Sequence, residues 1–290
     1  MKLLLKFNLI FLLIIAIGIA IAAYVSRVLL ERNARAEIAQ SARLLMDTAL
    51  ATRNYTTTQI QPLLETQMKY TFLPQSIPAY SATEVFGDLQ KKHNTYSYKE
   101  AVLNPTNPRN RAVEWETDVV GQFRSNKDTG EVIGERDTPN GRSFYVARPI
   151  RITNPGCLQC HSTVDAAPKT MIDRYGPANG FGWNLNEVIG AQIVSVPTQV
   201  PLARADDAFR VLMTAIGGIL LGIGVLLNLF LWLIVIRPVT ALAKFADRIS
   251  LGELDVPEYT RKSSDEIGGL AQSIGRMRTS LVQAMKMLEG

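Results

Sequence analysis

The chain has 290 residues with a formal net charge of +5, and 47% of its residues are hydrophobic. Lys2, Lys6 and Arg27 fall within residues 1–30, which contain no acidic residue, so much of the positive charge belongs to one terminus. No run of lysine and arginine is interleaved with aromatic residues, which argues against nucleic acid as a partner. We find no nucleophile–base pair or acid dyad with a persuasive spacing, so we expect no enzyme activity.

Residues 7–25 contain no charged residue and are long enough to cross a bilayer as one helix. Because flanking lysines favour the cytoplasmic side, we expect residues 1–6 in the cytoplasm. The alternative is a cleaved signal peptide, since Ala20-Ile21-Ala22 fits a small-residue cleavage site. The apolar run is longer than a signal core and helical sequence follows it, which favours a retained transmembrane anchor.

Residues 26–60 contain neither proline nor glycine. Apolar residues recur in this stretch at steps of four, three and four, at Ile38, Ala42, Leu45 and Ala49. The spacing predicts a long periplasmic helix with one apolar stripe, ending before Pro62. Met46 lies beside the stripe, which can pack on a domain core or on a partner helix.

Residues 61–210 have the pattern of one α+β domain. The sequence predicts helices over residues 82–90, 109–123 and 170–174, and strands over residues 96–102, 131–136, 143–152 and 187–196. Asn140-Gly141 between two of these strands predicts a β-hairpin. Interleaved helices and strands without a βαβ repeat indicate a small antiparallel sheet with flanking helices.

A Cys-x-x-Cys-His motif, Cys157 to His161, directly follows the hairpin and a Thr-Asn-Pro-Gly turn. Two thiols at this spacing can form thioethers to both vinyl groups of a haem, and the adjacent imidazole can ligate its iron. These are the only cysteines, and His93 is the only other histidine. A zinc site would lack soft ligands, and a thiol redox pair would not require the histidine. The motif predicts one covalently attached haem c per chain, held by Cys157, Cys160 and His161 at a sheet edge.

Residues 211–236 form a second uncharged run, which can span the membrane with some tilt. With the N-terminus inside, two spans place residues 31–210 outside the cell membrane and the chain after Arg237 in the cytoplasm. We therefore expect a multi-pass protein of the bacterial inner membrane. Its haem motif would lie in the periplasm, where attachment machinery acts and thiols are not kept reduced.

Residues 237–290 contain two heptad-like helices around a polar connector at residues 252–264. The first has apolar residues at Val239, Leu242, Ala246 and Ile249, and the second at Ile267, Leu270, Ile274, Met277, Leu281, Ala284 and Leu288. Two short helices cannot bury such seams alone, so the pattern predicts a parallel homodimer with a four-helix coiled coil. Solvated amphipathic helices are the alternative.

Two resemblances agree with these patterns. Residues 237–288, with Pro238, the connector and Asp265-Glu266-Ile267-Gly268, resemble a HAMP domain, the signal-relay module of bacterial membrane receptors. Residues 35–200 resemble the periplasmic haem c sensor domains of PAS-like fold, through residues 98–101, 103–107, 148–150, 157–161, 175–176 and 180–183. The second resemblance implies a haem cradled by the sheet and by the N-terminal helix.

The sequence does not decide which group ligates the iron opposite His161. Related domains can draw a distal methionine from the helix after the first span, and Met46 is in a comparable place. A thioether would suit redox sensing or electron transfer, whereas an open or water-bound iron would admit nitric oxide or carbon monoxide. His93 is a third candidate. Met46 is otherwise a core methionine, and His93 a solvated loop residue.

The sequence predicts haem contacts outside the motif less specifically. Arg53 and Arg148 are candidates to pair with haem propionates, and Phe144, Tyr145 or Trp183 to pack on the ring. Each is otherwise an ordinary core or surface residue.

These patterns together predict a dimeric membrane sensor. The redox or ligand state of a periplasmic haem would bias the HAMP bundle between two packings. Because no kinase, cyclase or methyl-accepting region follows in the sequence, we expect the output through a separate cytoplasmic signalling protein. The alternative is a membrane-anchored monohaem cytochrome that passes electrons to a periplasmic redox partner or within a larger complex. A third interpretation is a PAS-like domain that binds a small organic ligand, with haem as a structural element.

Overall fold

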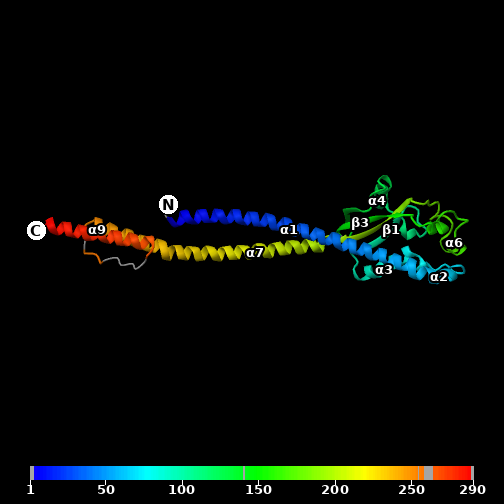
Figure 1. The fold of residues 1–290 in the computed structure, drawn as a ribbon, viewed down its shortest axis with the longest axis horizontal. Helices are drawn as coiled ribbons and strands as arrows, with labels where there is room; N and C mark the ends of the chain where they lie inside the picture. The colour runs from blue at the N-terminus through cyan, green and yellow to red at the C-terminus, as the bar shows by residue number, and fades with distance from the viewer. Residues whose placement is uncertain (1–2, 140, 254, 258–263, 289–290) are drawn as a thin grey trace. The chain divides into compact units, whose positions relative to one another are not determined.

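The computed structural model describes residues 3–139, 141–253, 255–257 and 264–288 (Figure 1). The chain divides into two compact units, one of residues 27–208 and one of residues 1–26 with 209–290. Helices α1 (Leu3–Tyr55) and α7 (Gln199–Phe230) contribute residues to both units.

The unit of residues 27–208 is built on one sheet. Its further elements are α2 (Gln61–Met68), α3 (Pro78–Lys92), β1 (Ser97–Val102), α4 (Glu114–Ser125), β2 (Val132–Thr138), β3 (Gly141–Arg151), α5 (Leu158–His161), α6 (Lys169–Tyr175) and β4 (Val188–Pro197). The strands lie in the order β1-β4-β3-β2, and every neighbouring pair is antiparallel. The predicted α+β class with a small antiparallel sheet is therefore confirmed.

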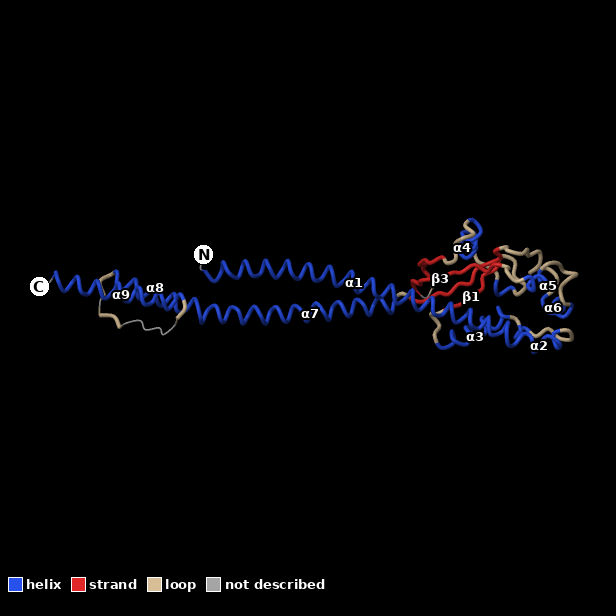
Figure 2. Tube along the Cα trace, in the orientation of Figure 1, coloured by secondary structure: helices blue, strands red, loops and turns tan. Residues whose placement is uncertain are grey.

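Helices cover both faces of the sheet. Figures 1 and 2 show α1 and α3 on one side and α4 on the other. The first face is buried by a cluster of residues from α1, α3 and the strands, namely Ile38, Ala42, Met46, Ala49, Ala82, Phe86, Tyr98, Val146, Val194 and Val196. The apolar stripe predicted for α1 thus packs on its own domain core.

The opposite face of the sheet packs against α4. Val119, Val120 and Phe123 of α4 form a second buried cluster with alternate residues of the strands, namely Ala101, Ala147, Ala191 and Ile193. Central strand β4 contributes to both clusters, as expected for a strand buried on both sides.

The predicted hairpin is confirmed, because β2 pairs with β3 up to Thr138 opposite Gly141. Asn140 of the predicted turn lies outside the described residues. Gly190 of β4 meets a different constraint, since a Cβ there would lie 2.3 Å from the carbonyl oxygen of Ala101 and 2.9 Å from Val102 Cα. Only glycine lets β1 and β4 approach this closely.

The prediction that the N-terminal helix ends before Pro62 is wrong. A π-type turn at Thr56–Ile60 leads directly into α2, and the amide of Gln61 donates to the carbonyl of Thr56, five residues back. The wider turn accommodates Pro62, which lacks an amide donor and would clash with the preceding turn of a regular α-helix. Threonine hydroxyls around this turn also donate to carbonyls four residues back, from Thr52, Thr56, Thr57 and Thr58.

The helix predicted over residues 109–123 begins only at Glu114. Arg111 instead bridges to Val102 of β1, and the amide of Ala112 donates to the Val102 carbonyl over 2.9 Å. The start of α4 is then fixed by Glu116, whose carboxylate accepts the amide of Val113 at 2.9 Å. The helices predicted over residues 82–90 and 170–174 lie within α3 and α6.

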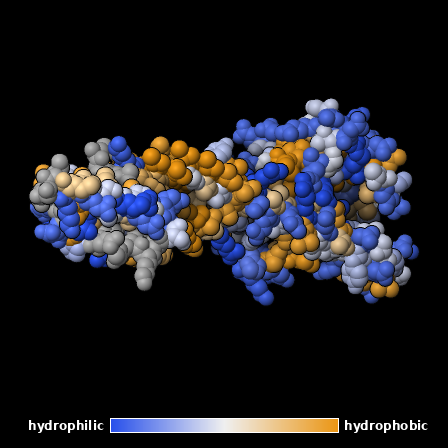
Figure 3. All heavy atoms as spheres, turned by 60° about the vertical axis from the view of Figure 1, so that its left-hand side comes forward, coloured by the Kyte–Doolittle hydropathy of each residue, from blue (hydrophilic) through white to orange (hydrophobic). Residues whose placement is uncertain are grey.

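Two helical stretches among the described residues, Leu4–Met68 and Gln199–Ser250, are long and apolar enough to cross a membrane, by length and composition. Their most apolar segments have no buried residues within the structure. Figure 3 shows hydrophobic residues gathered over these helices. The outer surface is therefore that expected of segments facing lipid.

After α7 and a second π-type turn at Leu231–Ile236, α8 (Arg237–Ser250) and α9 (Glu266–Leu288) follow. Phe245, Ile249 and Val256 form a small buried cluster, against which Ile274 of α9 packs. Most of the predicted connector, including Leu254 and residues 258–263, lies outside the described residues.

Candidate functional site

The two cysteines of the Cys-x-x-Cys-His motif sit on one short turn of helix. The preceding turn is fixed by Asn154, whose side chain accepts the Gly156 amide at 2.8 Å and whose carbonyl accepts the Cys157 amide at 3.1 Å. Cys157 and Cys160 are half-buried free thiols, and their spacing of three residues places them on the same side of that turn. Burial raises the pKa of the Cys160 thiol, and its neighbour Cys157 adds to the increase.

The imidazole of His161 is oriented by a backbone carbonyl. Its Nδ1 lies 2.8 Å from the carbonyl oxygen of Gly180, with the Thr106 hydroxyl at 3.4 Å. Since a carbonyl can only accept, Nδ1 carries the proton and Nε2 retains its lone pair. Burial lowers the pKa of His161, and the bond to Gly180 offsets part of that effect. A neutral imidazole with a free Nε2 is the form that ligates a metal.

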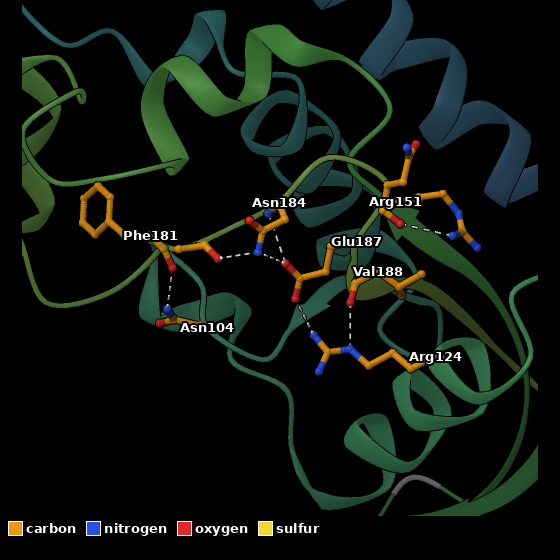
Figure 4. A network of polar contacts seen from close by, with 9 residues as sticks. Asn104, Arg124, Arg151, Phe181, Asn184, Glu187 and Val188 are labelled. Carbon is orange, nitrogen blue, oxygen red and sulfur yellow. Dashed lines mark hydrogen bonds and ion pairs between the residues drawn. The ribbon is translucent and has the colours of Figure 1, made fainter.

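Asn104 holds the loop that carries Gly180. Its side-chain oxygen accepts the Gly180 amide at 3.2 Å, and its side-chain nitrogen donates to the Phe181 carbonyl at 3.3 Å. Figure 4 shows the second of these bonds. Asn104 lies 76 residues before Gly180 in the sequence, so two distant segments join to position one imidazole.

Gly180 cannot be replaced without displacing this arrangement. Its φ is +88°, in the left-handed region that favours glycine. A Cβ at this position would also lie 2.0 Å from the Thr106 hydroxyl and 2.9 Å from Thr106 Cα. The conformation and the close approach both require glycine.

Trp183 completes the surroundings of His161. The two rings stack with centroids 3.9 Å apart and planes 18° apart. The Trp183 amide donates to the His161 carbonyl at 3.1 Å, and the Gly182 amide donates to the Ser162 carbonyl at 2.8 Å. Carbonyls at the end of a short helix, which lack intrahelical partners, are thereby satisfied.

The walls around the motif are apolar. Val102, Ile152 and Ile189 are buried there, and Cys157, Leu158 and Trp183 pack against them. The described residues include no group of three or more His, Cys, Asp or Glu side chains that could hold a bare metal ion. Haem brings four nitrogen ligands of its own, so two free thiols, one free Nε2 and an apolar wall fit that group.

A buried ion pair lies on the same sheet face. Glu100 of β1 is 3% exposed and accepts from the guanidinium of Arg53 and, at 2.8 Å, from the Tyr98 hydroxyl. Burial is the largest single effect on the pKa of Arg53 and lowers it, but the attraction of Glu100 and Tyr98 and the hydrogen bond to Glu100 together outweigh it, so the net shift is upward. Burial and the Glu100 charge both raise the pKa of Tyr98. Arg53, a candidate propionate partner, thus has a carboxylate partner within the protein.

The structure does not bring Met46 together with the cysteines. Met46 is fully buried in the cluster that contains Tyr98, whereas Cys157 packs in the cluster that contains Val102. Tyr98 and Val102 are four residues apart on β1, about 13 Å at the rise of a strand. This position is that of a core side chain, and distal ligation by Met46 stays a prediction.

The other candidates lie apart from the motif. Arg148 pairs with Asp47 at 2.7 Å and with Glu131 at 3.2 Å. Phe144 and Tyr145 pack in the clusters on opposite sheet faces. His93 is exposed at the end of α3, beside Tyr96. Of the aromatic candidates, Trp183 alone packs beside the motif.

Sequence reasoning missed the roles of Asn104, Thr106 and Gly180. All three belong to stretches that carried the resemblance, residues 103–107 and 180–183. The two glycines that flank Phe181 were the available signal in the sequence, and both adopt a positive φ in the structure.

The α+β domain, two helices able by length and composition to cross a membrane and the paired helices α8 and α9 form the arrangement of a membrane receptor. Residues 31–197 match the Tll0287-like family, and residues 230–283 match the HAMP domain. The first match covers more than half of the chain, which therefore belongs to the Tll0287-like family.

Among solved structures, the chain is similar to the crystal structure of the cyanobacterial haem protein Tll0287. The similarity covers 56% of this chain and 95% of that chain, with 13% sequence identity and a TM-score of 0.44. No curated protein matches the chain.

Removing the charge of Arg53 should destabilise the sensor domain. Arg53→Met leaves the Glu100 carboxylate buried without its cation, which typically lowers the free energy of unfolding by about 3–5 kcal/mol. Adding Glu100→Gln should restore most of that loss. Urea unfolding of the full chain in detergent, followed by pulse proteolysis, measures both. Arg109→Met, at the more exposed pair with Glu84, is the control and should cost less than about 1 kcal/mol; equal losses would contradict the prediction.

Met46→Leu separates packing from ligation. Leucine nearly conserves the volume, so we expect less than about 1.5 kcal/mol of destabilisation, and an unchanged haem absorption spectrum if Met46 is a core side chain alone. Met46→Ala should cost about 2–5 kcal/mol. Met171→Leu, at another buried methionine, is the control. Loss of a methionine-to-iron charge-transfer band in Met46→Leu alone would instead establish Met46 as the distal ligand.

Proposed function

We propose that this chain is a membrane-bound haem sensor that carries one haem c, joined to Cys157 and Cys160 and ligated by His161. The observation that supports this most directly is the orientation of His161, whose Nδ1 is bonded to the Gly180 carbonyl, which leaves the lone pair on Nε2, directly after two free thiols in the sequence. Membership of the Tll0287-like family, whose cyanobacterial relative is described as a haem protein, agrees with it.

When bound, the haem supplies a redox-active iron that also binds small ligands. The bond from Nδ1–H to the Gly180 carbonyl fixes the imidazole tautomer and makes Nε2 a stronger donor. Trp183 restricts rotation of the imidazole by stacking on it. Val102, Ile152 and Ile189 keep water from this side of the site. The protein thereby sets both the orientation and the polarity around the group.

The sensor domain lies in the periplasm in this proposal. The positively charged N-terminus favours the cytoplasm, and two spans return the HAMP domain to it. The domain would have the PAS-like fold of related haem c sensors, with haem attached by periplasmic machinery. The chain would have no catalytic site of its own.

The HAMP domain relays the state of the haem as a parallel homodimer. Seam residues of α9 support this, because Leu270 is 47%, Met277 48% and Leu281 42% exposed in the single chain. Apolar side chains repeated at heptad spacing are normally covered by a partner helix. A change of packing in the four-helix bundle would then reach a downstream signalling protein.

Covalent attachment is tested by removing the thiols. Cys157→Ser with Cys160→Ser should abolish haem-dependent peroxidase staining in denaturing gels and lower the mass of the chain by one haem. His161→Ala should alter the iron spin state. His93→Ala, at the other histidine, should leave the staining, the mass and the spin state unchanged. Full staining of the double serine variant would contradict the proposal.

The relay is tested by disulfide cross-linking in membranes. Because thioethers would occupy both native cysteines, Leu270→Cys or Leu281→Cys introduces the only free thiol. We expect cross-linked dimers at these seam positions, in amounts that differ between the oxidised and reduced states of the haem. Gln272→Cys, an exposed position outside the seam, should cross-link poorly. Seam cross-linking that ignores the haem state would contradict the relay and favour the electron-transfer alternative.

A further inference from the structure

A hollow lies between the end of α4 and the end of β3. Its volume is about 350 Å³, which is within the range of small-ligand pockets. The polar and charged side chains that line it are Arg124, Lys127, Arg151, Asn184, Asn186 and Glu187. Figure 4 shows Arg124 and Asn184 pointing toward Glu187, with Arg151 on a third segment.

The charge of this pocket is unbalanced. Its lining contains three cations, Arg124, Lys127 and Arg151, against one carboxylate, Glu187, which leaves a net charge of +2. Glu187 is already engaged, since it accepts from Arg124 at 3.1 Å and from the amide of Asn184 at 3.1 Å. The two remaining cations have no carboxylate partner among the interactions of the described residues.

Backbone carbonyls hold the arginines in place without neutralising them. Arg151 donates to the carbonyl of Lys127 at 2.8 Å and to that of Asn186 at 3.3 Å. Arg124 donates through Nε to the carbonyl of Val188 at 2.8 Å. A guanidinium has five N–H donors, so each arginine retains donors while its position is fixed. Fixed cations with spare donors are the feature of oxyanion sites.

The size and the lining of the pocket suit a small ligand. Leu185 and Val188 add apolar surface beside the cations, which suits the short carbon body of an organic acid. A stable protein partner would instead need an interface above about 1,000 Å². Lys127 lines the pocket and is exposed, and its long, flexible side chain can reach a bound anion.

We propose that this pocket binds a small organic anion through a carboxylate or phosphate group held by Arg151 and Lys127. The loop that contributes Asn184 and Glu187 also carries Gly180 and Trp183, which contact His161. A bound anion therefore contacts the segment that orients the imidazole. The anion is a second input, distinct from the haem.

Isothermal titration calorimetry of the full chain in detergent at low ionic strength tests this proposal, with succinate and inorganic phosphate as separate probes. We expect saturable binding of succinate with one site per chain, weakened at least tenfold by Lys127→Glu and retained by Lys127→Arg. Lys92→Glu, an equal charge change at an exposed lysine outside the pocket, is the matched control and should leave binding unchanged. Phosphate binding with the same dependence on Lys127 would support the site and identify an inorganic or phosphorylated source.

Two results would overturn the proposal: no binding of either probe, or equal weakening by Lys127→Glu and Lys92→Glu. The titration is repeated on the Cys157→Ser, Cys160→Ser chain. Succinate binding retained there would support the pocket even if the proposed haem function failed, so the two failures are distinguishable.

Discussion

The hydrogen bond from His161 to the Gly180 carbonyl is the interaction on which the rest of the site depends. It fixes which ring nitrogen carries the proton, and the carbonyl that accepts it belongs to Gly180, which adopts a positive φ in close contact with Thr106. Asn104 holds the same loop through two further bonds. The Cys-x-x-Cys-His motif is therefore short, but the orientation of its imidazole depends on contacts among three distant segments.

The two faces of the sheet pack against different partners. One face packs on α4, with strand residues that are mostly small or branched. The other passes from the core around Met46, through the buried pair of Arg53 and Glu100, to the apolar wall beside Cys157. Since a buried ion pair loses much of its stability when one partner is removed, Arg53 connects the fold of α1 to the strand beside the motif.

The parts of the fold and of the site that could be predicted are those that depend on the spacing of apolar residues or on short local motifs. The spacing of Ile38, Ala42 and Ala49 predicted the buried stripe of α1, and Asn140-Gly141 predicted the hairpin. The prediction that the N-terminal helix ends before Pro62 was wrong, because a π-type turn accommodates a proline that a regular α-helix would not. The Cys-x-x-Cys-His motif could be recognised in the sequence because its residues are adjacent. Partners such as Asn104, or Asp47 for Arg148, depend on contacts between segments that no local pattern encodes.

The pairing of β1 with β4 has a consequence for the order in which the domain can form. Of the described strands, the first along the chain pairs with the last, with Ser97 opposite Ser195. Such non-local pairing is slow and completes only after most of the domain has been made. Cys157 to His161 precede both the loop at Gly180 and strand β4, so they emerge before the structure that will half-bury them. The thiols are thus accessible for modification in the nascent chain, at a stage when the finished fold does not yet obstruct them.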